Sequence, residues 1–247
     1  TATNTAVATK TYDGNTTAAI TGTLAGLVNG ETAVFSQAGT FDSPNAGVRA
    51  VAVANTVAFT GSALADNYTL ANPTENVAGQ IDKATLTATN TAAATKTYDG
   101  NTTAAITGTL AGLVNGETAG FSQSGTFDSA NAGARTVAVT NAVAFTGSAL
   151  ADNYTLVNPT QSVAGQIDKA SLTATNTAAA TKTYDGNTTA AITGTLSGLV
   201  NGETAAFSQS GTFDSANAGT RTVAVANTVA FTGSALADNY ALVNQTG

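Results

Sequence analysis

The sequence repeats itself with a period of 86 residues. The string Lys-Thr-Tyr-Asp-Gly-Asn begins at Lys10, Lys96 and Lys182. Residues 1–84 and 87–170 differ at only 11 of 84 positions. Copies this similar are expected to share one fold, so the chain should hold three small domains rather than the one or two that its length suggests. We place the domains at residues 1–84, 85–170 and 171–247.

The third copy is shorter than the other two. The chain is 11 residues short of three full periods, and the strand-like segment Val163-Ala-Gly-Gln-Ile167 has no counterpart after Gly247. Residues Lys83 to Leu86 have no counterpart before Thr1. We therefore expect the third domain to be incomplete, with its last strand missing, and the sequence to be cut from a longer array.

Substitutions between the copies fall on alternate residues. Between 48 and 59 the changed positions are 48, 50, 54 and 56. The residues that stay the same in all copies are Val51, Val53, Asn55, Val57 and Phe59. Successive side chains of a strand point to opposite faces, so this alternation is typical of a strand with one buried and one wet face. Positions 34 and 38 change in the same way around Phe35 and Gln37, which predicts an all-β domain.

The strand spacing favours a β-sandwich. We predict strands over 3–9, 17–25, 33–41, 48–60, 67–72 and 77–81, repeated 86 and 172 residues later, with Asp13-Gly14 and Asn29-Gly30 as tight turns. Six or seven short strands favour an Ig-like sandwich, and a β-grasp-like sheet is the alternative if residues 61–67 form a helix. The residues expected to form the first core are Tyr12, Phe35, Phe41, Val51, Val53, Val57, Phe59, Tyr68 and Leu70.

The joint between copies lacks the residues of a flexible linker. The stretch Ile81-Asp-Lys-Ala-Thr-Leu86 has no Gly or Pro. The last strand of one domain should therefore run almost directly into the first strand of the next. Such joints would make the array a rod, in which strands of six to nine residues add roughly 30–40 Å per domain.

Composition excludes several classes of function. Only 9% of residues are charged and the net charge is −7, which disfavours nucleic acid and anionic membrane as partners. The chain has no Cys and no His, so thiolate metal sites and the commonest general base are missing, and we expect no enzyme. No run of 18 apolar residues is present, so we expect no membrane insertion by this segment.

Five short elements stand out in the first copy: Tyr-Asp-Gly-Asn-Thr from Tyr12, Gly26 to Glu31, Gly39 to Asp42, Asn45 to Gly47 and Asp66 to Leu70. In these elements the chain resembles the YDG-type repeats, related to MBG repeats, of large exported bacterial proteins such as filamentous-haemagglutinin-like adhesins. The resemblance implies a secreted or cell-surface location and a spacer role. It supplies no catalytic residue and no ligand.

Two hypotheses of function follow. The main one is a stalk that projects a distal binding region and supports cell adhesion or a biofilm matrix, with neighbouring repeats of the same chain as its partners. The alternative is a binding or self-assembly module that engages glycan or other chains, laterally or end to end, in an extracellular filament.

We expect no cofactor, and calcium is the one weak candidate. Calcium needs several oxygen ligands, and Asp82 and Asp168 lie at the domain joints. A Lys–Asn isopeptide bond is also disfavoured, because Lys10 precedes a strand-end Tyr by two residues and is expected to be solvated.

Overall fold

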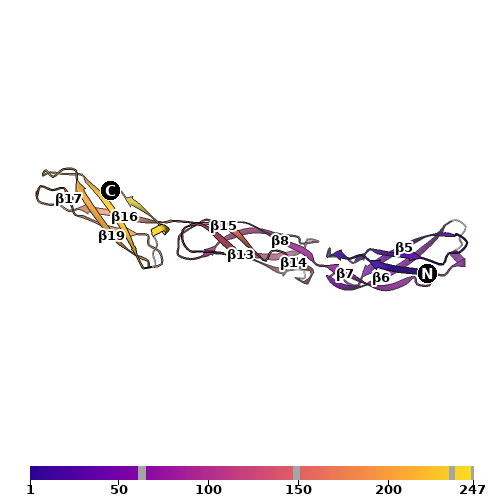
Figure 1. The fold of residues 1–247 in the computed structure, drawn as a ribbon. Helices are drawn as coiled ribbons and strands as arrows, with labels where there is room; N and C mark the ends of the chain where they lie inside the picture. Colours follow the sequence, from indigo (N-terminus) through magenta and orange to yellow (C-terminus); the bar gives the residue numbers. More distant parts are fainter. Residues whose placement is uncertain (61–64, 147–150, 234–236, 246–247) are drawn as a thin grey trace. The chain divides into compact units, whose positions relative to one another are not determined.

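A computed structural model describes residues 1–60, 65–146, 151–233 and 237–245 (Figure 1). These form two compact units whose boundary falls inside the second repeat. Unit 1 comprises 1–89, 109–122 and 141–159, and unit 2 comprises 90–108, 123–140 and 160–247. Each inter-repeat joint therefore lies within one unit.

Strands are the main regular element of the described chain, joined by turns and three short 3-10 segments. Repeat 1 contains β1 (Ala2–Val7), β2 (Lys10–Thr11), β3 (Thr17–Ala18), β4 (Ile20–Leu24), β5 (Thr32–Phe41), β6 (Gly47–Thr60), η1 (Ala65–Asn67) and β7 (Thr74–Asp82). Repeat 2 contains β8 (Ala84–Ala93), β9 (Lys96–Thr97), β10 (Thr103–Ala104), β11 (Ile106–Ala111), β12 (Thr118–Phe127), β13 (Gly133–Thr146), η2 (Ala151–Asn153), β14 (Tyr154–Leu156) and β15 (Thr160–Asp168). Repeat 3 contains β16 (Ala170–Ala179), β17 (Thr189–Ala190), β18 (Ile192–Ser197), β19 (Thr204–Phe213), β20 (Val223–Thr232), η3 (Ala237–Asn239) and β21 (Tyr240–Gln245).

Each repeat is built from two sheets. In repeat 1 the strand orders are β1-β4 and β2-β7-β6-β5-β3, and Figure 1 shows β5, β6 and β7 side by side. Repeat 2 has the orders β11-β8-β14 and β10-β12-β13-β15-β9, and repeat 3 has β18-β16-β21 and β17-β19-β20. The prediction of an all-β tandem array is confirmed.

The two sheets of repeat 1 enclose a hydrophobic core. Val7 and Ile20 from the smaller sheet pack against a cluster that includes Phe41, Val51 and Ile81 from the larger sheet. Along β6 the side chains alternate between buried and exposed, and all four positions that differ between copies are exposed. The face assignment made from these substitutions is therefore confirmed for this strand.

A row of hydrogen-bonded amide side chains also lies inside the sandwich. The Asn55 side chain is 4% exposed; its amide donates to the backbone oxygen of Asn72 at 2.9 Å and its carbonyl accepts from Gln37 at 3.1 Å. Gln37 also donates to Asn4 on the opposite sheet. A buried amide with its hydrogen bonds satisfied costs little and fixes the register of the strands that it joins.

The structure describes only the end of the segment 61–67, whose folding as a helix was the condition for the β-grasp alternative. Residues 65–67 form one 3-10 turn, while 61–64 lie outside the described residues. In the part of the chain that the structure describes there is no α-helix, and no helix is long and apolar enough to cross a membrane.

The strand predicted over 67–72 forms in the later repeats but not in the first. Tyr154 to Leu156 pair in parallel with Ala84 to Leu86, and Tyr240 to Leu242 pair with the segment from Ala170. In repeat 1, residues 68–70 lie outside any strand.

Candidate functional site at the repeat junctions

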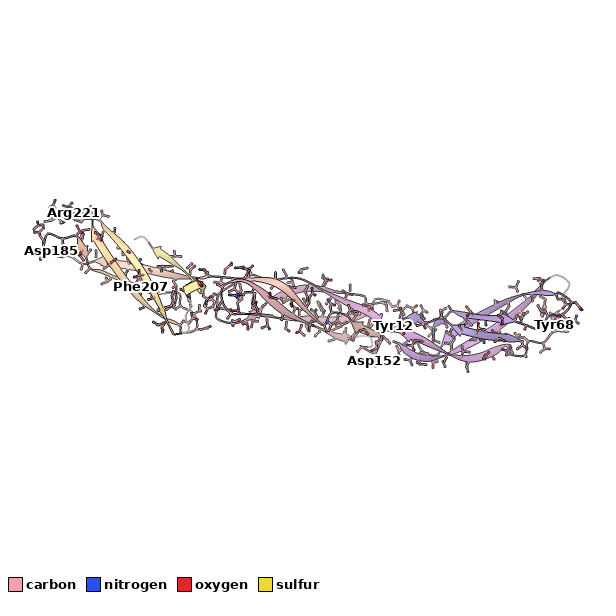
Figure 2. The ribbon with its side chains drawn as sticks, viewed as in Figure 1. Tyr12, Tyr68, Asp152, Asp185, Phe207 and Arg221 are labelled. Atoms are coloured by element: carbon pink, nitrogen blue, oxygen red, sulfur yellow. The ribbon has the colours of Figure 1, made fainter. Side chains whose placement is uncertain are left out.

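A single residue, Lys83, separates the last strand of repeat 1 from the first strand of repeat 2, and Lys169 separates β15 from β16 in the same way. The expectation of almost direct strand-to-strand joints is thus confirmed. Around the first joint, within unit 1, the turn after β2 contacts two segments of repeat 2. Figure 2 labels Tyr12 of repeat 1 and Asp152 of repeat 2 at this joint. Asp152 is the residue before Asn153, which takes part in the contact.

Tyr12 is the centre of the first junction. Its side chain is 5% exposed, and its ring meets the ring of Tyr154 edge-on at a centroid distance of 5.5 Å. Its hydroxyl donates to Oε1 of Glu117 at 2.5 Å, while the Tyr154 hydroxyl donates to Oε2 at 2.5 Å. One carboxylate therefore joins a tyrosine of repeat 1 to a tyrosine of repeat 2.

The junction changes the acidity of its tyrosines. Burial raises the pKa of Tyr12 to about 12, and the hydrogen bond to the Glu117 carboxylate adds to the effect. Burial and Glu117 also raise the pKa of Tyr154. Both hydroxyls are therefore held protonated, which lets them act as donors to the carboxylate.

Asp13 and Gly14 bring the two backbones close together. The Asn115 side chain donates to the backbone oxygen of Asp13 at 2.7 Å. Gly14 has φ of 75°, and a Cβ there would lie 1.8 Å from the Asn115 side-chain nitrogen. Asn115 itself has φ of 51°, in the two-residue turn before Glu117. Only glycine leaves room for this approach.

A buried asparagine completes the contact. Asn153 is 1% exposed; its carbonyl accepts from the Ala46 backbone at 2.8 Å and its amide donates to the Asn45 side chain at 3.1 Å. An unpaired amide at this depth would cost about 1–3 kcal/mol, so the turn at Asn45 and the end of repeat 2 depend on each other.

The loop that carries the signature is held by Lys10. Its ammonium lies 2.6 Å from the Asp13 carboxylate, donates to the Asn15 side chain at 2.8 Å and sits 5.9 Å from the Phe41 ring centroid. Its side chain is 18% exposed, so its stem is half-buried while its ammonium bonds to the exposed loop. Burial opposes ionisation of Asp13, but hydrogen bonds from Lys10 and the Asn15 backbone outweigh burial and lower its pKa.

Unit 2 contains a second junction with the same geometry. Tyr98 donates to Glu203 at 2.6 Å and meets Tyr240 edge-on at 5.5 Å, and burial with the Glu203 hydrogen bond raises its pKa to about 12. Asn201 donates to the Asp99 backbone at 2.7 Å. In repeat 3 the equivalent tyrosine, Tyr184, is 66% exposed. The tyrosine is therefore buried in the two repeats that have a docked neighbour.

The residues expected in the core lie at different depths. Tyr12, Phe41, Val51 and Val53 are buried, whereas Phe35, Val57, Phe59, Tyr68 and Leu70 are half-buried. Tyr68 stacks on Phe59 at a centroid distance of 5.1 Å, and its hydroxyl donates to Glu31. Tyr154 makes the equivalent contacts with Phe145 and Glu117 in repeat 2.

The two calcium candidates have protein partners. Asp82 and Asp168 each accept from the glutamine two positions earlier, at 3.1 and 3.2 Å. Across residues 1–60, 65–146, 151–233 and 237–245, no three metal-ligating carboxylates come together.

The residues of repeat 2 that contact repeat 1 around its Tyr-Asp-Gly signature were not predicted from the sequence. Asn115, Glu117 and Asn153 lie about 100 residues from their partners in the chain, so no local pattern connects them. One signal was present: each belongs to a landmark that is the same in all three copies. Most of the short sequence elements shared by the copies therefore lie on one side or the other of this junction.

The fold and its junctions define an all-β tandem-repeat protein in which the same set of contacts joins repeat 1 to repeat 2 and repeat 2 to repeat 3. The YDG domain family matches residues 1–75, 82–163 and 168–247, and the chain belongs to this family. A search of curated proteins gave no match. Among solved structures, InvD of Yersinia pseudotuberculosis is 14% identical over 90% of this chain and 81% of that chain, with a TM-score of 0.19. That TM-score does not show a shared fold, and the assignment rests on the YDG match.

Proposed function

We propose that the chain is a spacer: YDG repeats that hold a distal binding region away from the surface of a bacterium, as part of a secreted or surface-attached adhesin. The observation that carries the proposal is the recurrence of one junction. The contacts made by Tyr12 with Glu117 and Tyr154 recur for Tyr98 with Glu203 and Tyr240. A contact that joins each repeat to the next suits a protein whose task is extension.

The hydrophobic core supports a stiff joint. In unit 1 one hydrophobic cluster includes Tyr12, Phe41 and Val51 of repeat 1 together with Tyr154 of repeat 2. In unit 2 a second cluster includes Tyr98 and Phe127 of repeat 2 together with Tyr240 of repeat 3. Bending such a joint would expose apolar surface, at about 25 cal/mol per Å².

Small-angle scattering on chains of different length tests the spacer role. Duplicating residues 85–170 gives a chain with one more repeat and an identical set of junctions. We expect the largest dimension to grow by about 30–40 Å for each added repeat. A chain with both Tyr12→Ala and Tyr98→Ala is the control, and its dimensions should spread more widely. A largest dimension that does not grow with repeat number would contradict the proposal.

The surface location needs its own test. An antibody raised against the repeats should label intact, unpermeabilised cells that produce the parent protein. An epitope placed beyond the repeats should lose accessibility when repeats are deleted and regain it when they are restored. Labelling only after permeabilisation would contradict a surface spacer.

A further inference from the structure

The first and last strands of repeat 1 meet where the chain enters the repeat. The backbone N–H of Ala2 in β1 donates to the Asn72 side chain at 2.9 Å, and the Asn72 amide donates back to the Ala2 oxygen at 2.6 Å. Two residues further along β1, the Asn4 amide donates to the carboxylate of Glu75, the second residue of β7, at 2.8 Å. The start of β1 therefore lies beside the start of β7.

The same two segments also meet where the chain leaves the repeat. Lys10 of β2 pairs in parallel with Ile81 of β7. The backbone N–H of Tyr12 then donates to the backbone oxygen of Asp82, the last residue of β7, at 2.7 Å. The segment 2–12 thus runs beside β7 in the same direction, from the start of that strand to its end.

Close side-chain packing joins the two segments between these ends. A Cβ at Gly79 would lie 3.0 Å from the Val7 side chain and 2.7 Å from the Phe41 ring. Ile81, two residues later, is 0% exposed. Any sliding of β7 along its neighbours would drag these close-packed groups past one another, which breaks the dispersion contacts that close packing supplies.

The parallel arrangement decides how tension acts on the repeat. The chain enters at the start of β1 and leaves at the end of β7, and in a parallel pair these two points lie at opposite ends. Tension along the chain therefore slides one segment along the other and loads all the contacts between them at the same time. Antiparallel first and last strands would place both points at one end, where the pairs open one after another.

Unit 2 contains the same parallel contact in the strands of repeat 2. Lys96 of β9 pairs in parallel with Ile167 of β15. The backbone N–H of Tyr98 donates to the Asp168 oxygen at 2.7 Å, as that of Tyr12 does in repeat 1. The contact is therefore a repeated feature of the fold.

The joint between repeats continues this line of contacts. A single residue separates Asp82 from Ala84, and Ala84 pairs in parallel with Tyr154 at the start of β8. Tyr12 donates to Asp82 through its backbone and to Glu117 of repeat 2 through its hydroxyl. One tyrosine thus links the last strand of repeat 1 to the body of the next repeat, alongside the covalent chain.

We propose that repeats 1 and 2 bear mechanical tension through this parallel contact, which in repeat 1 joins the segment 2–12 to β7 and which we name the terminal clamp. The inference rests on the spacer function proposed above and adds a mechanical task to it: the spacer keeps its length while the cell that carries it is pulled. A repeat under tension gives way in one step, when the clamp slides, and it stays folded until that step.

Pulling one repeat in two directions tests the clamp. The chain has no cysteine, so pairs of introduced cysteines can attach handles at chosen points of the whole 247-residue chain. Thr3→Cys with Lys83→Cys, both at exposed positions, loads the clamp in the sliding direction. Thr32→Cys with Thr60→Cys, an exposed pair at the open ends of β5 and β6, peels that pair of strands apart. At one loading rate, we expect the sliding direction to need at least about twice the rupture force.

Two substitutions separate the clamp from general stability. Ile81→Ala removes a buried side chain from the clamp, whereas Val57→Ala shortens a half-buried side chain of β6 that pairs with Phe35, away from β7. Urea unfolding should show a lower free energy of unfolding for both variants. Only Ile81→Ala should lower the rupture force in the sliding direction.

Equal rupture forces in the two directions would overturn the clamp, and so would an unchanged sliding force in a folded Ile81→Ala chain. The comparison of directions uses no core substitution, so it decides the question even if that variant does not fold. Scattering and surface labelling test the spacer without any applied force. A chain whose length grows with repeat number but which ruptures equally in both directions would keep the spacer function and lose the clamp.

Discussion

Each residue of the Tyr-Asp-Gly signature has a separate role at the junction. The tyrosine hydroxyl reaches Glu117 in the next repeat, the aspartate holds its own loop and offers a backbone oxygen to Asn115, and the glycine leaves space for that asparagine. A hydrogen bond to a charged partner is worth about 1.5–3 kcal/mol. The signature thus describes contacts between repeats as well as a turn within one.

The glycine can be tested with a control that the chain itself provides. Gly100 and Gly186 have φ of 74° and 76°, but a Cβ lies 2.1 Å from Asn201 at Gly100 and meets nothing within 4 Å at Gly186. Both alanine variants should lose about 1–2 kcal/mol through backbone strain. Gly100→Ala should lose about 1 kcal/mol more, with the Asn201 hydrogen bond. Urea unfolding measures both, and equal losses would show that the close approach does not matter.

The tyrosines predict a loss of stability at alkaline pH. The pKa of Tyr12 and Tyr98 is raised from 10.0 to about 12, so the folded chain holds these protons more tightly than the unfolded chain. Their contribution is complete below pH 10, falls as the pH rises and is lost above the folded pKa near 12. The free energy of unfolding should therefore decline over that range. In a chain with Tyr12→Phe and Tyr98→Phe the decline should be smaller, and an unchanged slope would contradict this explanation.

At the scale of strands, the same element has different surroundings in each repeat. Val53 and Val139 are 2% exposed on strands paired along both edges, whereas Val225 lies half-buried on the open edge of β20. Valine to alanine should cost about 2 kcal/mol at Val53 or Val139, because two buried methyl groups are lost and a cavity remains. The cost at Val225 should be about half as large. Native-state hydrogen exchange of the substituted strand measures each effect.

The long strands were predictable and the short ones were not. Substitutions on alternate residues located 33–41 and 48–60 to within one residue, because one face of each strand is in water. Lys10–Thr11 was missed, since two residues carry no period and their partner, Ile81, is distant in sequence. Neither could a local pattern pair Tyr12 with Glu117, which lies 105 residues away. The sequence therefore predicts elements where periodicity is local, and it leaves open the contacts that topology creates.

At the scale of the whole chain, a substitution at a junction should change the stability of the two repeats that it joins and of no other repeat. Both junctions lie within one compact unit each, so a repeat is coupled to its neighbour by direct contacts. Tyr98→Ala should speed hydrogen exchange in β15, β16 and β21, which adjoin the second junction. Exchange in β5 and β6 should stay unchanged.

The matched variant reverses the pattern. Tyr12→Ala should speed exchange in β7 and β14 and leave β19 and β20 unaffected. Effects that spread equally over all three repeats would contradict nearest-neighbour coupling.

The identity of the two junctions has a consequence for inheritance. Every contact that joins one repeat to the next links residues whose equivalents recur 86 positions further on. Unequal crossing-over between the corresponding stretches of coding sequence would add or remove whole repeats and leave each remaining junction with its proper partners. Such a gene can change the length of its product in a single event without passing through a misfolded intermediate form, so related strains should differ in repeat number before they differ in junction residues.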